Sequence, residues 1–246
     1  RSVDHVLCIF PFEPELLARH GIASTYVGHP LAQVIPQEPD RGRARQALEL
    51  GEGDEVLAIL PGSRAAEVKL LTPLFFEAAR LLARQRPALR FVVPAVPAFK
   101  AEIEAAARAA GLAQPQLRIV AGQSHTVLAA CDLTLIASGT ATLEAALFKR
   151  PMVIAYRMNW LSWRITEAKR LQPWVGLPNI LAGDFVVPEL LQHHATAPAL
   201  AAGCLEWLEA PARMAAVQEQ FAALHQQLRR DTATLATDAI EKIYKG

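Results

Sequence analysis

Residues 132–156 read Asp-Leu-Thr-Leu-Ile-Ala-Ser-Gly-Thr-Ala-Thr-Leu-Glu-Ala-Ala-Leu-Phe-Lys-Arg-Pro-Met-Val-Ile-Ala-Tyr. Two short apolar runs in this stretch, 133–136 and 152–155, are typical of buried parallel strands. Between them Leu143, Ala146 and Leu147 share one helical face. The stretch therefore predicts a strand, a loop, a crossover helix and a second strand.

The loop of this unit has the features of an anion site. Ser138, Gly139 and Thr140 stand where the strand ends and the helix begins, so free backbone N–H groups and the positive end of the helix dipole point outward together. Glu144 follows one turn later, where a carboxylate can accept hydrogen bonds from the vicinal hydroxyls of a ribose. A solvated helix glutamate is an equally good interpretation of Glu144 alone.

A second loop of this kind follows the apolar run 56–60. Gly62 allows close backbone approach, Ser63 can cap a helix, and Arg64 can bind phosphate oxygens with two hydrogen bonds. The competing interpretation is that Arg64 forms a surface ion pair with Glu67. The position of Arg64 in the loop favours the phosphate role.

Further strands are expected at 91–93 and 117–120, each alternating with a helical segment. This alternation predicts an α/β fold with a doubly wound parallel sheet that binds ligands at the carboxyl ends of its strands. Neither loop contains the dinucleotide fingerprint or the Walker lysine, which disfavours hydride transfer and nucleoside triphosphate hydrolysis.

The first 34 residues contain one strand–helix–strand unit, which is too little for a domain. We therefore expect residues 1–34 to be the C-terminal end of an incomplete domain within a longer protein, and residues 35–246 to form the ligand-binding domain. From about residue 187 onward the pattern is nearly all helical. The last helix, near 233–244, could reach back to the first domain.

Two features between these regions leave alternatives open. Tryptophans and basic residues interleave from 160 to 174, as at an anionic membrane surface or an acyl-chain path, or on an ordinary amphipathic helix. Asn179 follows Pro178 and could recognise a hydroxyl or phosphate group, although a turn-forming asparagine is the ordinary explanation.

Composition limits the partners. The 246 residues are 52% hydrophobic with a net charge of +1, which provides a core but no field that would gather nucleic acid. Cys8, Cys131 and Cys204 have no spacing for metal or disulfide, so we expect buried thiols in a reducing compartment. No apolar run approaches the roughly 20 residues that cross a bilayer.

Taken together, these motifs resemble the lipid-A-disaccharide synthase family. The matching residues are Phe10-Pro11-Phe12-Glu13, Gly28-His29-Pro30, Leu60-Pro61-Gly62-Ser63-Arg64 with Glu67-Val68, Gly122-Gln123-Ser124, Ala137-Ser138-Gly139-Thr140-Ala141-Thr142-Leu143-Glu144, Pro151-Met152-Val153 with Tyr156-Arg157-Met158, Leu177-Pro178-Asn179 with Leu181-Ala182-Gly183, and Leu224-His225-Gln226-Gln227.

The resemblance implies a B-type glycosyltransferase fold of two Rossmann-like domains. It implies UDP-2,3-diacylglucosamine as donor, 2,3-diacylglucosamine 1-phosphate as acceptor, inversion at the anomeric carbon, and neither metal nor cofactor. Arg64 would stabilise the departing diphosphate as the catalytic residue, Asn179 would help to fix the donor, and Gln123 would meet the uracil. The family is also compatible with a homodimer and with peripheral association on the cytoplasmic face of the inner membrane.

The carboxylate expected to deprotonate the acceptor belongs to a part of the family that precedes this sequence. We therefore expect the chain alone to bind UDP or the donor but to catalyse poorly or not at all. Two alternatives remain: an enzyme similar to UDP-N-acetylglucosamine 2-epimerase, and a non-catalytic module that binds UDP-sugars.

Overall fold

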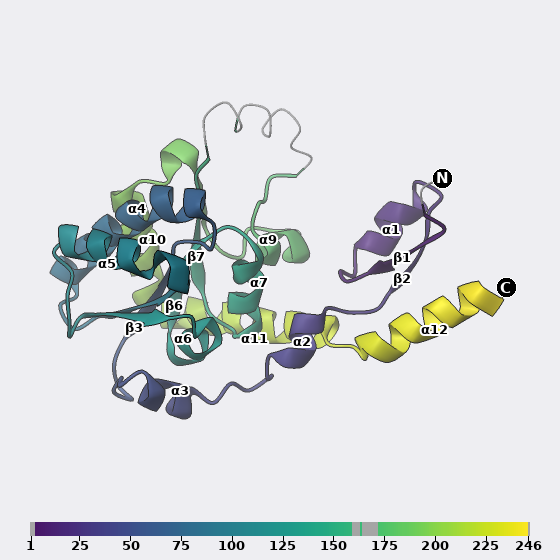
Figure 1. The fold of residues 1–246 in the computed structure, drawn as a ribbon, viewed down its shortest axis with the longest axis horizontal. Helices are drawn as coiled ribbons and strands as arrows, with labels where there is room; N and C mark the ends of the chain where they lie inside the picture. Colours follow the sequence, from purple (N-terminus) through teal and green to yellow (C-terminus); the bar gives the residue numbers. More distant parts are fainter. Residues whose placement is uncertain (1–2, 159–162, 164–171, 246) are drawn as a thin grey trace.

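The computed structural model describes residues 3–158, 163 and 172–245 and contains two parallel sheets of different size (Figure 1). The larger sheet has six strands in the order β5-β4-β3-β6-β7-β8. These strands are β3 (Val56–Leu60), β4 (Arg90–Ala95), β5 (Leu117–Ala121), β6 (Leu133–Ala137), β7 (Met152–Tyr156) and β8 (Glu189–Leu191). The predicted doubly wound parallel sheet is thus confirmed.

Helices cover both faces of the larger sheet. They are α3 (Arg41–Ala47), α4 (Ala65–Gln85), α5 (Lys100–Ala109), α6 (Ser124–Ala130), α7 (Thr140–Leu147), α9 (Leu177–Ala182), α10 (Ala197–Leu208) and α11 (Pro211–Leu228), with single 3-10 turns at Pro97–Phe99 and Gln192–His194. On one face α4 packs against α5 and α10, and on the other α6 packs against α3 (Figure 1). Every residue of β3 and of β6 is therefore buried.

The order of the strands creates a switch point between β3 and β6. After β3 the chain moves outward to β4 and β5, returns to β6 beside β3, and then moves outward in the other direction to β7. Leu60 pairs with Ile136 at the carboxyl ends of these two strands. The loops that follow β3 and β6 consequently start side by side, which is where open α/β sheets bind ligands.

The smaller sheet pairs β1 (His5–Cys8) with β2 (Ala23–Tyr26), and α1 (Glu13–Ala18) connects them. Helix α12 (Thr232–Lys245) extends from the larger body and lies beside β1 (Figure 1). Gly28 makes the crossing possible: its φ is +85°, and a Cβ atom there would lie 2.7 Å from Cβ of Arg230 and 2.9 Å from the Leu228 carbonyl oxygen.

His225 ties three helices together at this crossing. Its buried ring lies between α2 (Pro30–Val34), α7 and α11: Nε2 is 2.9 Å from the Ala32 carbonyl oxygen, and Nδ1 is 2.8 Å from Nζ of Lys149. Burial lowers the pKa of His225 and lowers that of Lys149 to about 8. A neutral ring that donates from Nε2 to Ala32 and accepts at Nδ1 from Lys149 satisfies these two contacts, and Nδ1 also lies 3.2 Å from the Leu147 carbonyl oxygen.

The part of the chain after residue 187 contains a strand that the sequence did not predict. The segment after residue 187 was predicted to be nearly all helical, but Glu189–Leu191 forms the edge strand β8 paired with β7. A run of three residues has no periodicity that separates strand from helix. The basic tryptophan-rich stretch 160–174 lies outside the described residues, except for Trp163 and residues 172–174.

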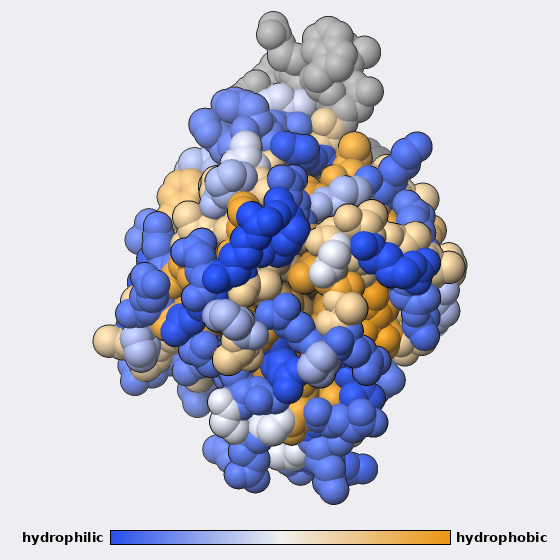
Figure 2. All heavy atoms as spheres, turned by 90° about the vertical axis from the view of Figure 1, so that its left-hand side faces the viewer, coloured by the Kyte–Doolittle hydropathy of each residue, from blue (hydrophilic) through white to orange (hydrophobic). Residues whose placement is uncertain are grey.

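The three cysteines are buried, as predicted from the sequence. All three cysteines are buried free thiols, and burial raises the pKa of Cys131 and Cys204 to about 12. The side of the molecule that carries α3 and α5, at the left of Figure 1, is mostly hydrophilic with separate hydrophobic patches (Figure 2). No helix within the described residues is long and apolar enough to span a membrane.

Candidate functional site: a cavity at the switch point

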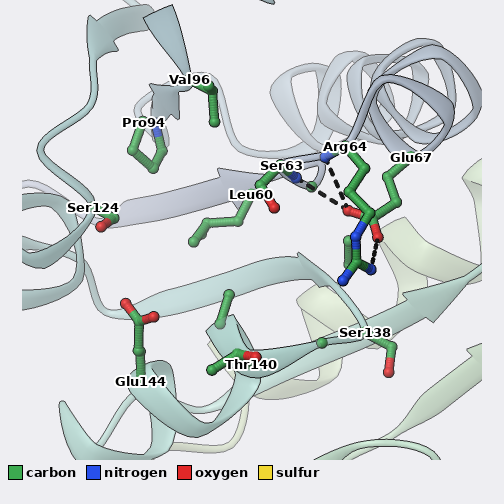
Figure 3. A pocket seen from close by; sticks show the side chains of 14 residues that line it. Leu60, Ser63, Arg64, Glu67, Pro94, Val96, Ser124, Ser138, Thr140 and Glu144 are labelled. Carbon is green, nitrogen blue, oxygen red and sulfur yellow. Dashed lines mark hydrogen bonds and ion pairs between the residues drawn. The ribbon is translucent and has the colours of Figure 1, made fainter. Parts of the chain in front are cut away.

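A cavity of about 320 Å³ opens where β3 and β6 end (Figure 3). Its lining residues come from both predicted loops and from β4 and α6: Leu60, Gly62, Ser63, Arg64, Glu67, Pro94, Val96, Ser124, Ala137, Ser138, Gly139, Thr140, Ala141 and Glu144. Seven of the nine predicted binding residues therefore surround one space. Among the residues that surround this space, all of them in the described part of the chain, Arg64 is the only Lys or Arg.

The amino end of α7 forms the lower wall of the cavity in Figure 3. Gly139 precedes the helix and has no side chain that could cap it, so the first N–H groups of α7 are available to a ligand. Ser138 is held in place because its backbone N–H donates to the Ala155 carbonyl and its hydroxyl donates to the Val175 carbonyl at 3.2 Å. The wall can therefore bind an anion without further rearrangement.

Glu144 lies one turn along α7, and one of its two carboxylate oxygens contacts a neighbouring side chain. One carboxylate oxygen, Oε2, is 3.1 Å from Nε2 of His125, whose ring also contacts the ring of Phe148. His125 is a site residue that the sequence analysis missed, although it directly follows the Gly122-Gln123-Ser124 motif. The second oxygen of Glu144 is left to accept hydrogen bonds from a ligand.

The loop after β3 is arranged differently from its prediction. Oε2 of Glu67 accepts hydrogen bonds from the backbone N–H of Ser63 at 3.1 Å and of Arg64 at 3.4 Å, and Oε1 is 3.0 Å from Nη1 of Arg64 (Figure 3). The N–H groups assigned to a phosphate are thus already bound to a carboxylate. Arg64 pairs with Glu67, as the ion-pair interpretation predicts, and it also borders the cavity; its phosphate role stays a prediction.

Two predicted residues do not line the cavity. Gln123 adopts a left-handed conformation, with φ of 60°, just before α6, and its neighbour Ser124 lines the space instead. Asn179 is fully buried: its amide donates to the Val187 carbonyl and to Glu189, and its oxygen accepts from the N–H groups of Val186 and Val187. Both amide hydrogens and both acceptor positions of its oxygen are used within the protein, so the Asn179 side chain cannot also bind the sugar donor directly.

The described residues contain no group of three or more His, Cys, Asp or Glu side chains arranged to hold a metal ion. Charge at the site is carried instead by the helix dipoles, Arg64, Glu67 and Glu144.

Solved structures with the same architecture define the fold of this chain. The glycosyltransferase WaaG, involved in lipopolysaccharide biosynthesis, superposes with a TM-score of 0.62 at 17% identity, over 100% of this chain and 64% of that one. A UDP-GlcNAc 2-epimerase from Neisseria meningitidis, bound to UDP-GlcNAc, gives 0.63 at 11% identity, over 99% and 61%. The chain has the B-type glycosyltransferase fold, which both of these proteins share.

The family follows from sequence. The family described as Lipid-A-disaccharide synthetase matches residues 1–242. The lipid-A-disaccharide synthase of Albidiferax ferrireducens is 67% identical over 100% of this chain and 64% of its own length, and that of Burkholderia pseudomallei is 48% identical over 99% and 62%. The chain belongs to the lipid-A-disaccharide synthetase family and spans less than two thirds of the length of these relatives.

Proposed function

We propose that this chain is the donor-binding part of a glycosyltransferase of lipid A assembly. The reaction would transfer 2,3-diacylglucosamine from UDP-2,3-diacylglucosamine to 2,3-diacylglucosamine 1-phosphate, giving lipid A disaccharide 1-phosphate and UDP. The observation that carries the proposal is that a member of this family places the open amino end of α7 and Glu144 on one cavity at the switch point of its sheet.

The site suits the departure of UDP. The 6-hydroxyl of the acceptor would attack the anomeric carbon with inversion, and the bond from that carbon to the diphosphate would break with its electron pair leaving on UDP. Negative charge then grows on the diphosphate, where the positive end of the α7 dipole and the Arg64 guanidinium would stabilise it. Glu144 would bind the ribose hydroxyls with the oxygen that His125 leaves available.

Residues 1–34 would be the end of an acceptor-side domain, and α12 would pack back on it. Support comes from the small β1–β2 sheet, which lies apart from the larger sheet and has α12 beside it. Apolar side chains of both segments are exposed, among them Leu16 at 50% and Ile240 at 57%. Two parallel strands make at most a marginal sheet alone, which supports this proposal.

The proton of the attacking 6-hydroxyl needs a base that the cavity does not supply in a suitable place. Of its two carboxylates, Glu67 is bound to the α4 amino end and Glu144 is assigned to the ribose. General-base catalysis is typically worth about 10²–10⁴-fold. We therefore propose that the chain alone binds its donor but turns over slowly or not at all. Homodimerisation and peripheral membrane association stay predictions from the resemblance.

Donor preference tests the proposal against its alternatives. Calorimetric titrations with UDP-2,3-diacylglucosamine and with UDP-N-acetylglucosamine, both in the same detergent, should show tighter binding of the acylated sugar. Equal or tighter binding of UDP-N-acetylglucosamine would favour the 2-epimerase-like alternative. Binding of UDP with no contribution from either sugar would favour a non-catalytic module.

A further inference from the structure

Glu67 is the second carboxylate, besides Glu144, that lines the cavity proposed to receive a diphosphate. We propose that Glu67 is a positioning residue that occupies the place of a donor phosphate on residues 61–64 and is displaced when the diphosphate binds. The inference rests on the proposed function, because it concerns the same UDP site. It adds a residue that sets how tightly the diphosphate is held.

The hydrogen bonds of Glu67 are those that a phosphate would use. Its Oε2 atom takes both the Ser63 and the Arg64 backbone N–H groups, and its Oε1 atom takes Nη1 of Arg64. A phosphate at the amino end of a helix next to an arginine would need the same three donors. The carboxylate and the diphosphate therefore compete for them.

Gly62 shows that the loop is shaped around this carboxylate. A Cβ atom built on Gly62 would lie 2.5 Å from Cβ and 2.6 Å from Oε2 of Glu67, closer than real side chains approach one another. The φ of Gly62 is +118°, which only glycine adopts readily. Glycine at this position thus admits the Glu67 side chain, whereas the sequence analysis assigned it to the approach of a ligand.

The charges around the cavity favour the displacement of the Glu67 carboxylate by a diphosphate. Its lining, which lies wholly within the described residues, carries one arginine and two glutamates. While Glu67 holds Arg64, the upper wall has almost no net positive charge to offer a diphosphate. Arg64 is 83% exposed and Glu67 20%, so the guanidinium can turn into the cavity once the carboxylate releases it.

The two walls of the cavity consequently have different roles. The amino end of α7 begins at a glycine and is open before any ligand arrives, while the amino end of α4 is closed by Glu67. A diphosphate would first bind to α7 and then compete with Glu67 for Arg64. On departure of UDP, Glu67 would return to its donors and favour release of the product.

Glu67→Gln tests the competition, because the amide keeps an oxygen that can cap α4 but removes the charge and the ion pair. Calorimetry on the 246-residue chain should show UDP binding about five- to tenfold more tightly to Glu67→Gln than to the wild type, as expected for one partly screened charge. Uridine, which lacks the diphosphate, should bind both proteins within about twofold of each other. Glu67→Ala should also tighten UDP binding, with a lower melting temperature because the cap is lost.

Glu77→Gln is the matched control, since it removes one negative charge from the same helix at a position that is 59% exposed. It should leave UDP affinity unchanged. Equal UDP affinity of the wild type and Glu67→Gln, or weaker binding by Glu67→Gln, would overturn the inference while leaving the UDP site intact. Failure of the wild type to bind UDP would overturn the proposed function, and the inference with it.

Discussion

Asn179 connects the segment before β8 to the start of α9 through one side chain. Its amide nitrogen donates to the Val187 carbonyl and to Glu189, and its amide oxygen accepts from the backbone N–H groups of Val186 and Val187. Glu189 in turn accepts the backbone N–H groups of Val175 and Gly176. Because Ser138 donates to the Val175 carbonyl, this network supports the wall of the cavity from behind.

Asn179→Ala should destabilise the chain strongly. It leaves two backbone N–H groups and the Glu189 carboxylate with fewer partners in a buried region, and each buried group without a partner costs about 1–3 kcal/mol. Urea denaturation should show a loss of roughly 2–4 kcal/mol. Gln220→Ala, at an exposed amide on α11, is the control and should change stability by less than about 0.5 kcal/mol. A similar small change for both variants would refute the structural role of Asn179.

Site residues that follow one another in the chain were predictable, and those that depend on distant partners were not. Ser138, Gly139, Thr140 and Glu144 lie on one strand-to-helix turn, so local periodicity placed them correctly around a cavity. Asn179 has the residue type of a ligand contact, but its partners lie on the segment leading into a strand that has no sequence signal. The ion pair of Arg64 with Glu67 is predicted as an alternative to phosphate binding, and the structure contains this pair at the border of the cavity.

At the scale of elements, α2, α7 and α11 meet at His225. Helix α7, whose amino end borders the cavity, ends at Leu147, and Lys149 two residues later contacts His225 and thus the crossing between the two sheets. Burial lowers the pKa of His225, and the positive charges of Lys149 and Arg229 nearby lower this pKa further. The helix whose amino end lines the cavity is therefore anchored near its other end to the crossing.

This junction should make stability depend on pH. The pKa of His225 is lower in the folded chain than its ordinary value of 6.5, so the unfolded chain binds the proton more readily. Stability is then lost as pH falls below about 6.5 towards the folded pKa. His225→Gln should lose less stability between pH 7 and pH 5 than the wild type, measured as free energy of unfolding in urea.

His20→Gln, which removes an exposed histidine, should keep the pH dependence of the wild type. His29, whose pKa burial also lowers, is present in all three proteins and contributes equally. The same pH dependence in His225→Gln as in the wild type would contradict the assignment of His225 as a buried neutral group.

Elements were predicted well where hydrophobic periodicity is long or fully apolar. The runs that form β3, β6 and β7 are buried along their length, and α7 follows the predicted face. Strand β4 begins one residue before and ends two residues after the expected range 91–93, because strand ends have no sharp signal. Strand β8 escaped prediction because pairing with β7, rather than local preference, defines it.

At the scale of the whole molecule, the larger sheet presents two helix amino ends to one cavity. The strand order could be inferred only in outline, since alternating strands and helices predict a doubly wound sheet but not which strands are neighbours. The structure shows that β3 and β6 are adjacent, and this adjacency brings Arg64 and Glu144 to the same space. We propose that this space is the UDP site.

Calorimetric titration of the purified 246-residue chain with UDP tests that claim most directly, alongside Arg64→Ala, Glu144→Ala and the control Glu104→Gln on α5. The wild type and Glu104→Gln should bind UDP with the same affinity. Arg64→Ala and Glu144→Ala should each lose on the order of 1–3 kcal/mol of binding free energy, as expected for charge-assisted hydrogen bonds. Wild-type affinity in both alanine variants, or no binding by a folded wild-type chain, would contradict the account.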